Sequence, residues 1–432
     1  MQPSVPVQTA PRAALSRTSL LVAACSTIIE WYDFTLCLYF ATVLSRVFFG
    51  AGTASLLTAL GGFAVSYLMR PLGAVFFGHI GDRHGRRRMM LLSMALMTGA
   101  MLATALLPTR AQLGGLAGWL LLLLRCLMAF SVGGEYTGVV AYLLEGARPG
   151  RRGFVTSLAA AASEVGALLA VGVCALLVAA LPAAAVDTWG WRLPFLLGAA
   201  LAGGVWLARS TMQESPDFER QQEAGTVPTA PLRYTLRHHR PAILRTFSIS
   251  ALGSITYYVG ITYVPTFLAT TGQRPESEAL GLSTIAAVVV VLVTPVVGAL
   301  SDRWGRKPVL AVLAGFSALL PITLFSLMRG GSSWQAVGGA VALAAVAGGV
   351  SAVGAAATAE QFPGEGRLSG LALGATAATA VFGGLTPFLA ELLIARTGWP
   401  LVPGAMIALV GLLVLPVVLT MPETAFSDQP KQ

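Results

Sequence analysis

The feature that most constrains this chain is its series of unbroken apolar segments, each long enough to cross a bilayer as a helix. A soluble core of that size would need polar residues alternating with the apolar ones, and these segments lack such alternation. Only 11% of the 432 residues are charged, against about 25% in an ordinary soluble domain. We predict an all-α membrane protein with twelve transmembrane helices, at residues 18–48, 54–80, 87–107, 113–144, 154–181, 190–209, 242–270, 279–300, 308–328, 334–359, 367–396 and 400–421.

The net charge of +9 comes almost entirely from arginines, which sit in short clusters between the apolar segments. They form no single polar face, so they do not indicate a nucleic-acid partner. Arginines follow the second, fourth and eighth segments, and the positive-inside rule then places these loops and both termini in the cytoplasm. We expect a multi-pass protein of the bacterial cytoplasmic (inner) membrane that contacts the lipid bilayer and works as a monomer.

An internal repeat divides the chain into two related halves. Four loop stretches pair without gaps, 78–87 with 298–307 and 145–152 with 360–367. Two different loops thus report one duplication. We predict two pseudo-symmetric six-helix bundles, at residues 1–209 and 242–432, joined by a polar cytoplasmic linker at 210–241.

The first repeated loop combines glycines for close helix approach, an acid that can accept hydrogen bonds, and arginines on the cytoplasmic side. Such a loop can act as a latch that closes the cytoplasmic gate in one state and releases it in another. A topology signal alone would explain the arginines but not two acids in matching register. The expected gate residues are Gly78, Asp82, Arg83, Gly85 and Arg86, with Gly298, Asp302, Arg303, Gly305 and Arg306 in the second copy.

Several further motifs accompany the two loops, which share the pattern G-x-x-x-D-R-x-G-R-[RK]. They are Glu30-Trp31-Tyr32-Asp33-Phe34, Arg70-Pro71-Leu72-Gly73, 130–136, 189–192, Glu214-Ser215-Pro216 and Phe362-Pro363. On these motifs the chain resembles the major facilitator superfamily, and within it the metabolite:proton symporters that carry citrate, α-ketoglutarate, shikimate and proline or betaine. The resemblance implies proton-driven uptake, with the first, fourth, seventh and tenth spans lining a central cavity.

Five ionisable residues stand out inside predicted spans: Glu30, Asp33, Arg125, Glu135 and Glu164. Each would cost about 2.5–3.5 kcal/mol if central and unpaired, so they should face protein, water or one another. Glu30 and Asp33 are three residues apart near the predicted midplane, where two carboxylates cannot both ionise cheaply. We expect Asp33 to carry the proton with support from Glu30, or else to form a structural ion pair. Glu164 is a further proton-coupling candidate, and Glu135 should relay protons or support the gate.

Arg125 is the expected anchor for an anionic substrate, because a guanidinium is permanently charged and binds carboxylates with two hydrogen bonds. Alternatively, it only neutralises Asp33 or Glu164. In the second half, Tyr257 and Tyr258 are expected to contact substrate, although a buried helix interface could use the same residues.

These features predict a proton symporter that imports a small organic acid anion, such as citrate or another di- or tricarboxylate. The alternative substrate is a zwitterion such as proline or betaine, with its cation among Trp31, Tyr32, Tyr257 and Tyr258. A proton-driven exporter is disfavoured, because 159–166 lacks the proline of the exporters' fifth-span motif. We expect no enzyme activity, cofactor or metal, since the sequence shows no nucleophile motif or metal-ligand spacing.

Overall fold

The computed structural model describes residues 15–50 and 53–426, and within them the fold is built from helices alone. Nine helical segments in this described part are long and apolar enough to cross a membrane, one of them the run of shorter helices at Arg367–Thr397, and two bent pairs raise that number to as many as eleven. The predicted span 54–80 is the remaining one. It is divided at Leu68 into two shorter helices, so neither reaches spanning length by itself.

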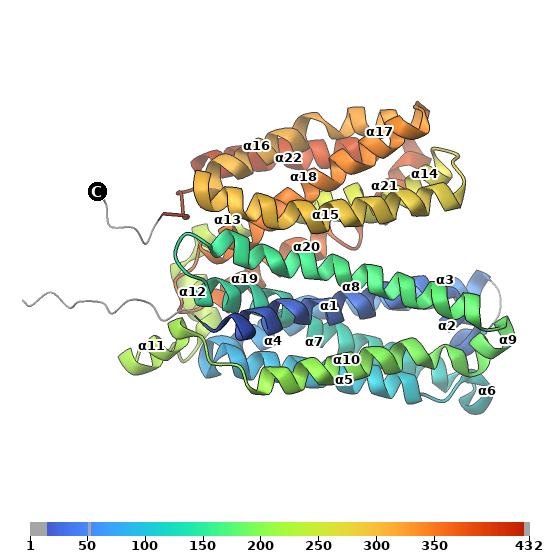
Figure 1. Ribbon diagram of the computed structural model, residues 1–432, viewed down its shortest axis with the longest axis horizontal. Helices are drawn as coiled ribbons and strands as arrows, with labels where there is room; N and C mark the ends of the chain where they lie inside the picture. The colour runs from blue at the N-terminus through green and yellow to red at the C-terminus, as the bar shows by residue number, and fades with distance from the viewer. Residues whose placement is uncertain (1–14, 51–52, 427–432) are drawn as a thin grey trace, which may run out of the picture.

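The N-terminal half forms one layer of helices, drawn in blue to green in Figure 1. Its elements are α1 (Arg17–Tyr39), α2 (Ala41–Leu44), the π-helical turn η1 (Ser45–Phe49), α3 (Thr53–Tyr67), α4 (Met69–His84), α5 (Arg86–Leu106), α6 (Arg110–Leu113), α7 (Leu116–Gly146), α8 (Arg152–Ala180), α9 (Ala183–Ala185), the π-helical turn η2 (Val186–Gly190) and α10 (Arg192–Ser210).

The C-terminal half forms the second layer, drawn in yellow to red, and α15 runs along α8 where the layers meet (Figure 1). Its elements are α13 (Arg240–Tyr257), the π-helical turn η3 (Tyr258–Thr262), α14 (Val264–Thr270), α15 (Glu276–Trp304), α16 (Arg306–Leu319), α17 (Pro321–Gly330), α18 (Ser333–Ala359), α19 (Arg367–Leu371), the π-helical turn η4 (Ala372–Thr376), α20 (Ala377–Phe382), α21 (Thr386–Thr397) and α22 (Val402–Thr420).

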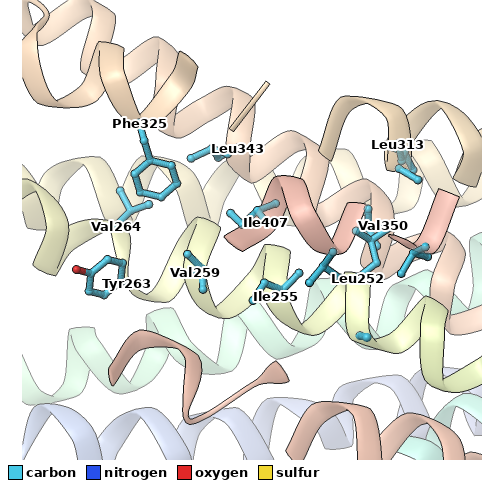
Figure 2. Packing of buried hydrophobic residues seen from close by; sticks show 14 of the residues in the cluster. Leu252, Ile255, Val259, Tyr263, Val264, Leu313, Phe325, Leu343, Val350 and Ile407 are labelled. Carbon is cyan, nitrogen blue, oxygen red and sulfur yellow. The ribbon is translucent and has the colours of Figure 1, made fainter. Parts of the chain in front are cut away.

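The seventh predicted span, 242–270, bends by 42° between η3 and α14. Pro265 is the second residue of α14, and proline lacks the N–H that would continue the backbone ladder. Buried side chains hold the bent span in its own half: Ile255, Val259 and Val264 pack into one apolar cluster with residues of α17, α18 and α22 (Figure 2). The bend is therefore part of a packed core.

The linker is more ordered than the solvated loop that the sequence suggested. It contains α11 (Pro216–Ala224) and α12 (Pro231–His238), which lie at one end of the molecule (Figure 1), where α11 contacts α7 and α12 contacts α4 and α19. Phe218 and Gln221 of α11 are buried. Its apolar side therefore packs against the bundles, which a count of charged residues does not reveal.

Candidate functional site

A cavity of about 200 Å³ lies between the two halves. That is more than ten times the space one water needs, so a small metabolite could enter it. The first, fourth, seventh and tenth spans all contribute to its lining, through α1, α7, α13 and α18. Its charged lining residues are Glu30, Arg70 and Glu164, and all three come from the N-terminal half.

Arg70 is the sole lysine or arginine that lines this cavity in the described part of the chain. Its guanidinium carbon lies 4.5 Å from the ring centre of Tyr67 and 5.2 Å from that of Phe34, so two aromatic faces stabilise its charge. Its nearest acid is Glu30, at 3.6 Å from Arg70 Nη1 to Glu30 Oε1. That distance is longer than a charge-assisted hydrogen bond.

This ion pair has unused hydrogen-bonding capacity. Glu30 Oε2 and Arg70 Nε are buried, and neither has a hydrogen-bond partner among the described residues. Buried polar atoms normally have partners, so a loose pair beside a cavity indicates room for a polar ligand. Arg70 was missed as a site residue in the sequence. The signal was present, because Arg70 is an ionisable residue inside the predicted span 54–80.

Aromatic side chains from both halves meet at the same cavity. Trp31 of α1 contacts Tyr257 of α13 edge to face, with ring centres 5.2 Å apart. Tyr257 contacts Tyr258 at 5.6 Å, and the hydroxyls of Tyr258 and Tyr67 are 2.7 Å apart. Trp31, Tyr257 and Tyr258 therefore line the cavity, and their contact with a substrate stays a prediction.

The candidate Tyr32 does not reach the cavity. Its side chain is fully buried inside the N-terminal bundle, and its hydroxyl donates a hydrogen bond of 2.8 Å to the Pro194 carbonyl. Neighbouring residues on a helix point about 100° apart, so Trp31 and Tyr32 cannot both face the same space. Substrate contact by Tyr32 does not fit this arrangement.

Arg125 and Asp33 are paired with each other, which is the alternative that the sequence left open. Arg125 Nη1 donates to Asp33 Oδ2 at 2.8 Å, and both side chains are almost completely buried. They line a smaller pocket of about 60 Å³ that shares Glu30, Tyr67 and Arg70 with the central cavity. Neither residue lines the central cavity itself, whereas Arg70 does.

Glu135 lies apart from the cavity, in a fully buried polar cluster of the N-terminal bundle. Arg209 at the end of α10 pairs with it, and Ser93 donates to it at 2.5 Å. Arg209 was not among the candidates from the sequence, although it stands at the last position of the predicted span 190–209. A proton relay through Glu135 remains a prediction.

The two repeated loops meet helix starts in the opposite half. Asp82 accepts hydrogen bonds from the backbone N–H groups of Leu368 and Ser369 at 3.1 and 2.8 Å, where α19 begins. Asp302 accepts from Gly153 and Phe154, both at 2.8 Å, where α8 begins. Each acid therefore satisfies free N–H groups at a helix N-terminus and stabilises its positive end. We call the end of the molecule that carries both contacts the latch face.

The arginines of the loops divide into two kinds. Arg86 is fully buried and pairs with Glu145 at 2.9 Å, and Arg306 pairs with Glu360 at 3.0 Å in the equivalent place. Arg83 and Arg303 are exposed instead; Arg83 donates to the Thr229 carbonyl of the linker. Among the described contacts, neither Arg83 nor Arg303 forms an ion pair across the latch, so their expected role in the gate stays a prediction.

Gly85 and Gly305 adopt φ of +102° and +100°, a region that favours glycine. A Cβ at Gly85 would lie 2.3 Å from a carboxylate oxygen of Glu214, which accepts from the N–H groups that begin α5. Likewise, a Cβ at Gly305 would lie 2.4 Å from a carboxylate oxygen of Glu423, which accepts from the N–H groups that begin α16. Close approach explains Gly298, where a Cβ would lie 2.6 Å from the Gly153 carbonyl of α8. Gly78 faces the Leu368 carbonyl similarly, at 3.2 Å.

The linker takes part in the latch. Arg367 of α19 donates to Glu145 at 2.6 Å and to Asp217 of α11 at 3.0 Å, and Ser215 also donates to Glu145. One buried network thus joins both halves and the linker. Elsewhere, no three His, Cys, Asp or Glu side chains gather as metal ligands in the part of the chain that the structure describes.

Family models match both halves of the chain. Residues 19–230 match the model described as "Sugar (and other) transporter", and residues 275–432 match the model described as "Major Facilitator Superfamily". The α-ketoglutarate permease of Escherichia coli strain K12 is 34% identical over 86% of this chain and 86% of its own length. The chain belongs to the major facilitator superfamily.

Other relatives in this superfamily have names with different substrates. The citrate-proton symporter of Klebsiella pneumoniae is 30% identical over 93% of this chain and 91% of its own. The proline/betaine transporter of Escherichia coli strain K12 is 31% identical over 95% of this chain and 84% of its own length. Among solved structures, the proton:xylose symporter XylE bound to 6-bromo-6-deoxy-D-glucose superposes with a TM-score of 0.77 at 20% identity, covering 94% of this chain and 96% of that one. The fold and family are those of proton-coupled transporters rather than enzymes.

Proposed function

We propose that this chain is a proton symporter that imports a small metabolite bearing a carboxylate, with Arg70 as its anion-binding residue. The observation that carries the proposal is the loose Arg70–Glu30 pair in the central cavity, at 3.6 Å with a buried atom of each residue unpartnered. A guanidinium with free donors can take a carboxylate, because the two geometries match.

Proton coupling follows from the electrostatics of this pair. A buried arginine needs one anionic partner, and the ionised Glu30 supplies it when the cavity holds no substrate. When a substrate carboxylate takes that place, a second carboxylate beside it is repelled, so Glu30 binds a proton. Substrate and proton are therefore bound together, and Glu30 takes the main coupling role that the sequence gave to Asp33.

Movement between the two sides rests on the latch face. In this conformation both latches are closed, because Asp82 and Asp302 each hold a helix start of the opposite half. Since the arginine bias places these loops in the cytoplasm, the cytoplasmic gate is shut in this state. Breaking both contacts would open the cavity to the cytoplasm, as alternating access requires.

The names of the relatives support a carboxylate but do not select one, since α-ketoglutarate, citrate, proline and betaine all carry that group. The test uses purified protein in liposomes with an inward proton gradient. Labelled α-ketoglutarate, citrate, shikimate, proline and glycine betaine are offered in turn. No gradient-driven uptake of any of them would reject the proposal.

Variants then test the two roles separately. Arg70→Gln should raise the KM for a transported substrate by roughly 10–150-fold, since hydrogen bonds to charged groups contribute about 1.5–3 kcal/mol. Glu30→Gln should keep substrate exchange but lose accumulation against a gradient. Arg329→Gln is the matched control, because Arg329 is exposed and lies on α17 outside the cavity. Normal accumulation by Glu30→Gln would remove Glu30 from the proton path.

A further inference from the structure

The central cavity contains more negative than positive groups. Its charged lining is one guanidinium, Arg70, and two carboxyl groups, Glu30 and Glu164. Even with Glu30 protonated, one cation and one carboxylate remain. A di- or tricarboxylate would bring several negative charges next to Glu164, and like charges in a site of low dielectric repel strongly. The charge balance instead suits a substrate without net charge.

Glu164 of α8 is the unexplained member of this set. Its side chain is about 3% exposed, it lines the cavity, and it has no ion-pair partner among the described residues. Its carboxyl group instead forms a hydrogen bond with the side chain of Tyr257, from the opposite half. A buried carboxylate without a cation is costly, so its presence in a binding cavity points to a cationic ligand group or to a proton.

The surroundings of Glu164 suit a cation. Trp31 and Tyr257 are inclined at 67°, and Tyr257 and Tyr258 at 72°. All three rings line the same cavity as Glu164, and aromatic rings attract quaternary ammonium groups. Trp31 Nε1 is also buried without a hydrogen-bond partner.

A chain of contacts connects this corner to the anion-binding end. Tyr257 touches Tyr258, Tyr258 touches Tyr67, and Tyr67 touches the guanidinium of Arg70. Arg70 and Glu164 thus lie at opposite ends of one continuous row of aromatic side chains. A ligand lying along that row would meet the positive Arg70 at one end and the negative Glu164 at the other.

We propose that Glu164, Trp31 and Tyr257 form a subsite for the cationic group of the substrate, so that the transported molecule is a zwitterion with an ammonium and a carboxylate. The inference rests on the proposed function, because Arg70 must hold the carboxylate. The ammonium lies against the two rings and is neutralised by Glu164. It favours the zwitterion, which the sequence left as the alternative substrate, over the di- or tricarboxylate that the sequence put first.

The test compares pairs of ligands of the same shape. Binding of glycine betaine is measured in detergent, without any gradient, against the tert-butylacetate anion, in which carbon replaces the quaternary nitrogen. γ-Butyrobetaine and its carbon analogue form a second pair with a longer spacing between the charges. The wild-type protein should bind one zwitterion roughly tenfold or more tightly than its carbon analogue.

Glu164→Gln should lower that ratio, because the variant loses both the attraction for the ammonium group and the repulsion of the anionic carbon analogue. Retained or tighter binding of the carbon analogue also shows that the variant is folded. Glu391→Gln is the control; Glu391 is on α21 outside the cavity, where it accepts a hydrogen bond from Thr270. A ratio near one in the wild-type protein would overturn the subsite, as would a ratio unchanged in Glu164→Gln. If Glu164→Gln lost only gradient-driven accumulation, Glu164 would be a proton site instead.

The two proposals fail separately. Proton-driven uptake of α-ketoglutarate or citrate with no binding of either zwitterion would reject the subsite and leave the symporter standing. Absence of gradient-driven uptake for every compound, zwitterions included, would reject the symporter itself.

Discussion

At the scale of single residues, two arginine–carboxylate pairs in adjoining pockets differ in how completely they are closed. Arg125 and Asp33 are in direct contact at 2.8 Å, whereas Arg70 and Glu30 are 3.6 Å apart beside the larger cavity. A ligand can compete more easily for the looser pair. We therefore assign substrate binding to the Arg70 pair and positioning of α1 against α7 to the Arg125 pair.

Side-chain direction explains which of these residues the sequence could place. The spacing of Glu30 and Asp33 set them on one broad face, but residues three apart still differ by about 60° around a helix. That angle lets Glu30 line the central cavity as well as the smaller pocket, whereas Asp33 lines the smaller pocket alone. The sequence indicates buried charge correctly, yet the partner of each charge depends on how the helices pack together.

If the Arg125–Asp33 pair positions α1 against α7, its removal should change the free energy of unfolding. Asp33→Asn or Arg125→Gln alone should lower the free energy of unfolding by about 3–5 kcal/mol, because each leaves a buried charge without its partner. The double variant should lose less than the sum of the two. Thermal unfolding in detergent of the four proteins completes the cycle.

The exposed pair Arg46–Asp187, also 2.8 Å apart, is the control for that cycle. Its removal should cost no more than about 1 kcal/mol. Additive losses for Asp33 and Arg125 would contradict the pairing. A substrate affinity that falls in Arg125→Gln with unfolding unchanged would return Arg125 to the anchor role.

At the scale of helices, each latch is an acid that holds the N-terminus of a helix from the other half. The sequence indicated the acids, glycines and arginines in two matching loops. It did not indicate that Asp82 would contact α19 or that Asp302 would contact α8, because every residue except proline has a backbone N–H group and the sequence does not show which of them lack a partner. Nor did it indicate that Glu214 and Glu423 would hold the starts of α5 and α16.

Loss of a latch acid should favour opening at the latch face. In Asp302→Ala the N–H groups of Gly153 and Phe154 lose their acceptor, and such contacts contribute about 0.5–2 kcal/mol, or a factor of roughly 2–30 in population. Spin labels at Arg148 and Arg303, both exposed and in opposite halves, report the opening in a background without the native cysteines.

The distance distribution between those labels should move to longer values in Asp302→Ala. The control Glu219→Gln removes an exposed carboxylate from the linker on the same face and should leave the distribution as it is. Identical distributions in all three proteins would show that the latch does not set the gate.

At the scale of the whole molecule, the halves repeat in their latches but not in the walls of their cavity. The N-terminal half supplies Glu30, Arg70 and Glu164, while the C-terminal half supplies tyrosines, serines and threonines. The five internal ionisable residues that the sequence singled out all precede residue 210, in line with this asymmetry. The sequence could not predict the balance of charge at the substrate, because that depends on Arg125 and Asp33 neutralising each other away from the cavity.

That balance fixes the direction in which a membrane potential should act on transport. A zwitterion carries no net charge, so its import with one proton moves one positive charge inward per cycle. A potential negative inside should then accelerate uptake and raise accumulation, by about 2.3 kcal/mol or roughly fiftyfold at equilibrium for each 100 mV. A dicarboxylate with one proton would move net negative charge inward and be slowed by the same potential. Uptake into liposomes is measured at a fixed pH gradient while valinomycin and a potassium gradient set the potential. Acceleration by an inside-positive potential would contradict the zwitterion, whereas no response would mean that proton and substrate charges cancel, as for a monocarboxylate.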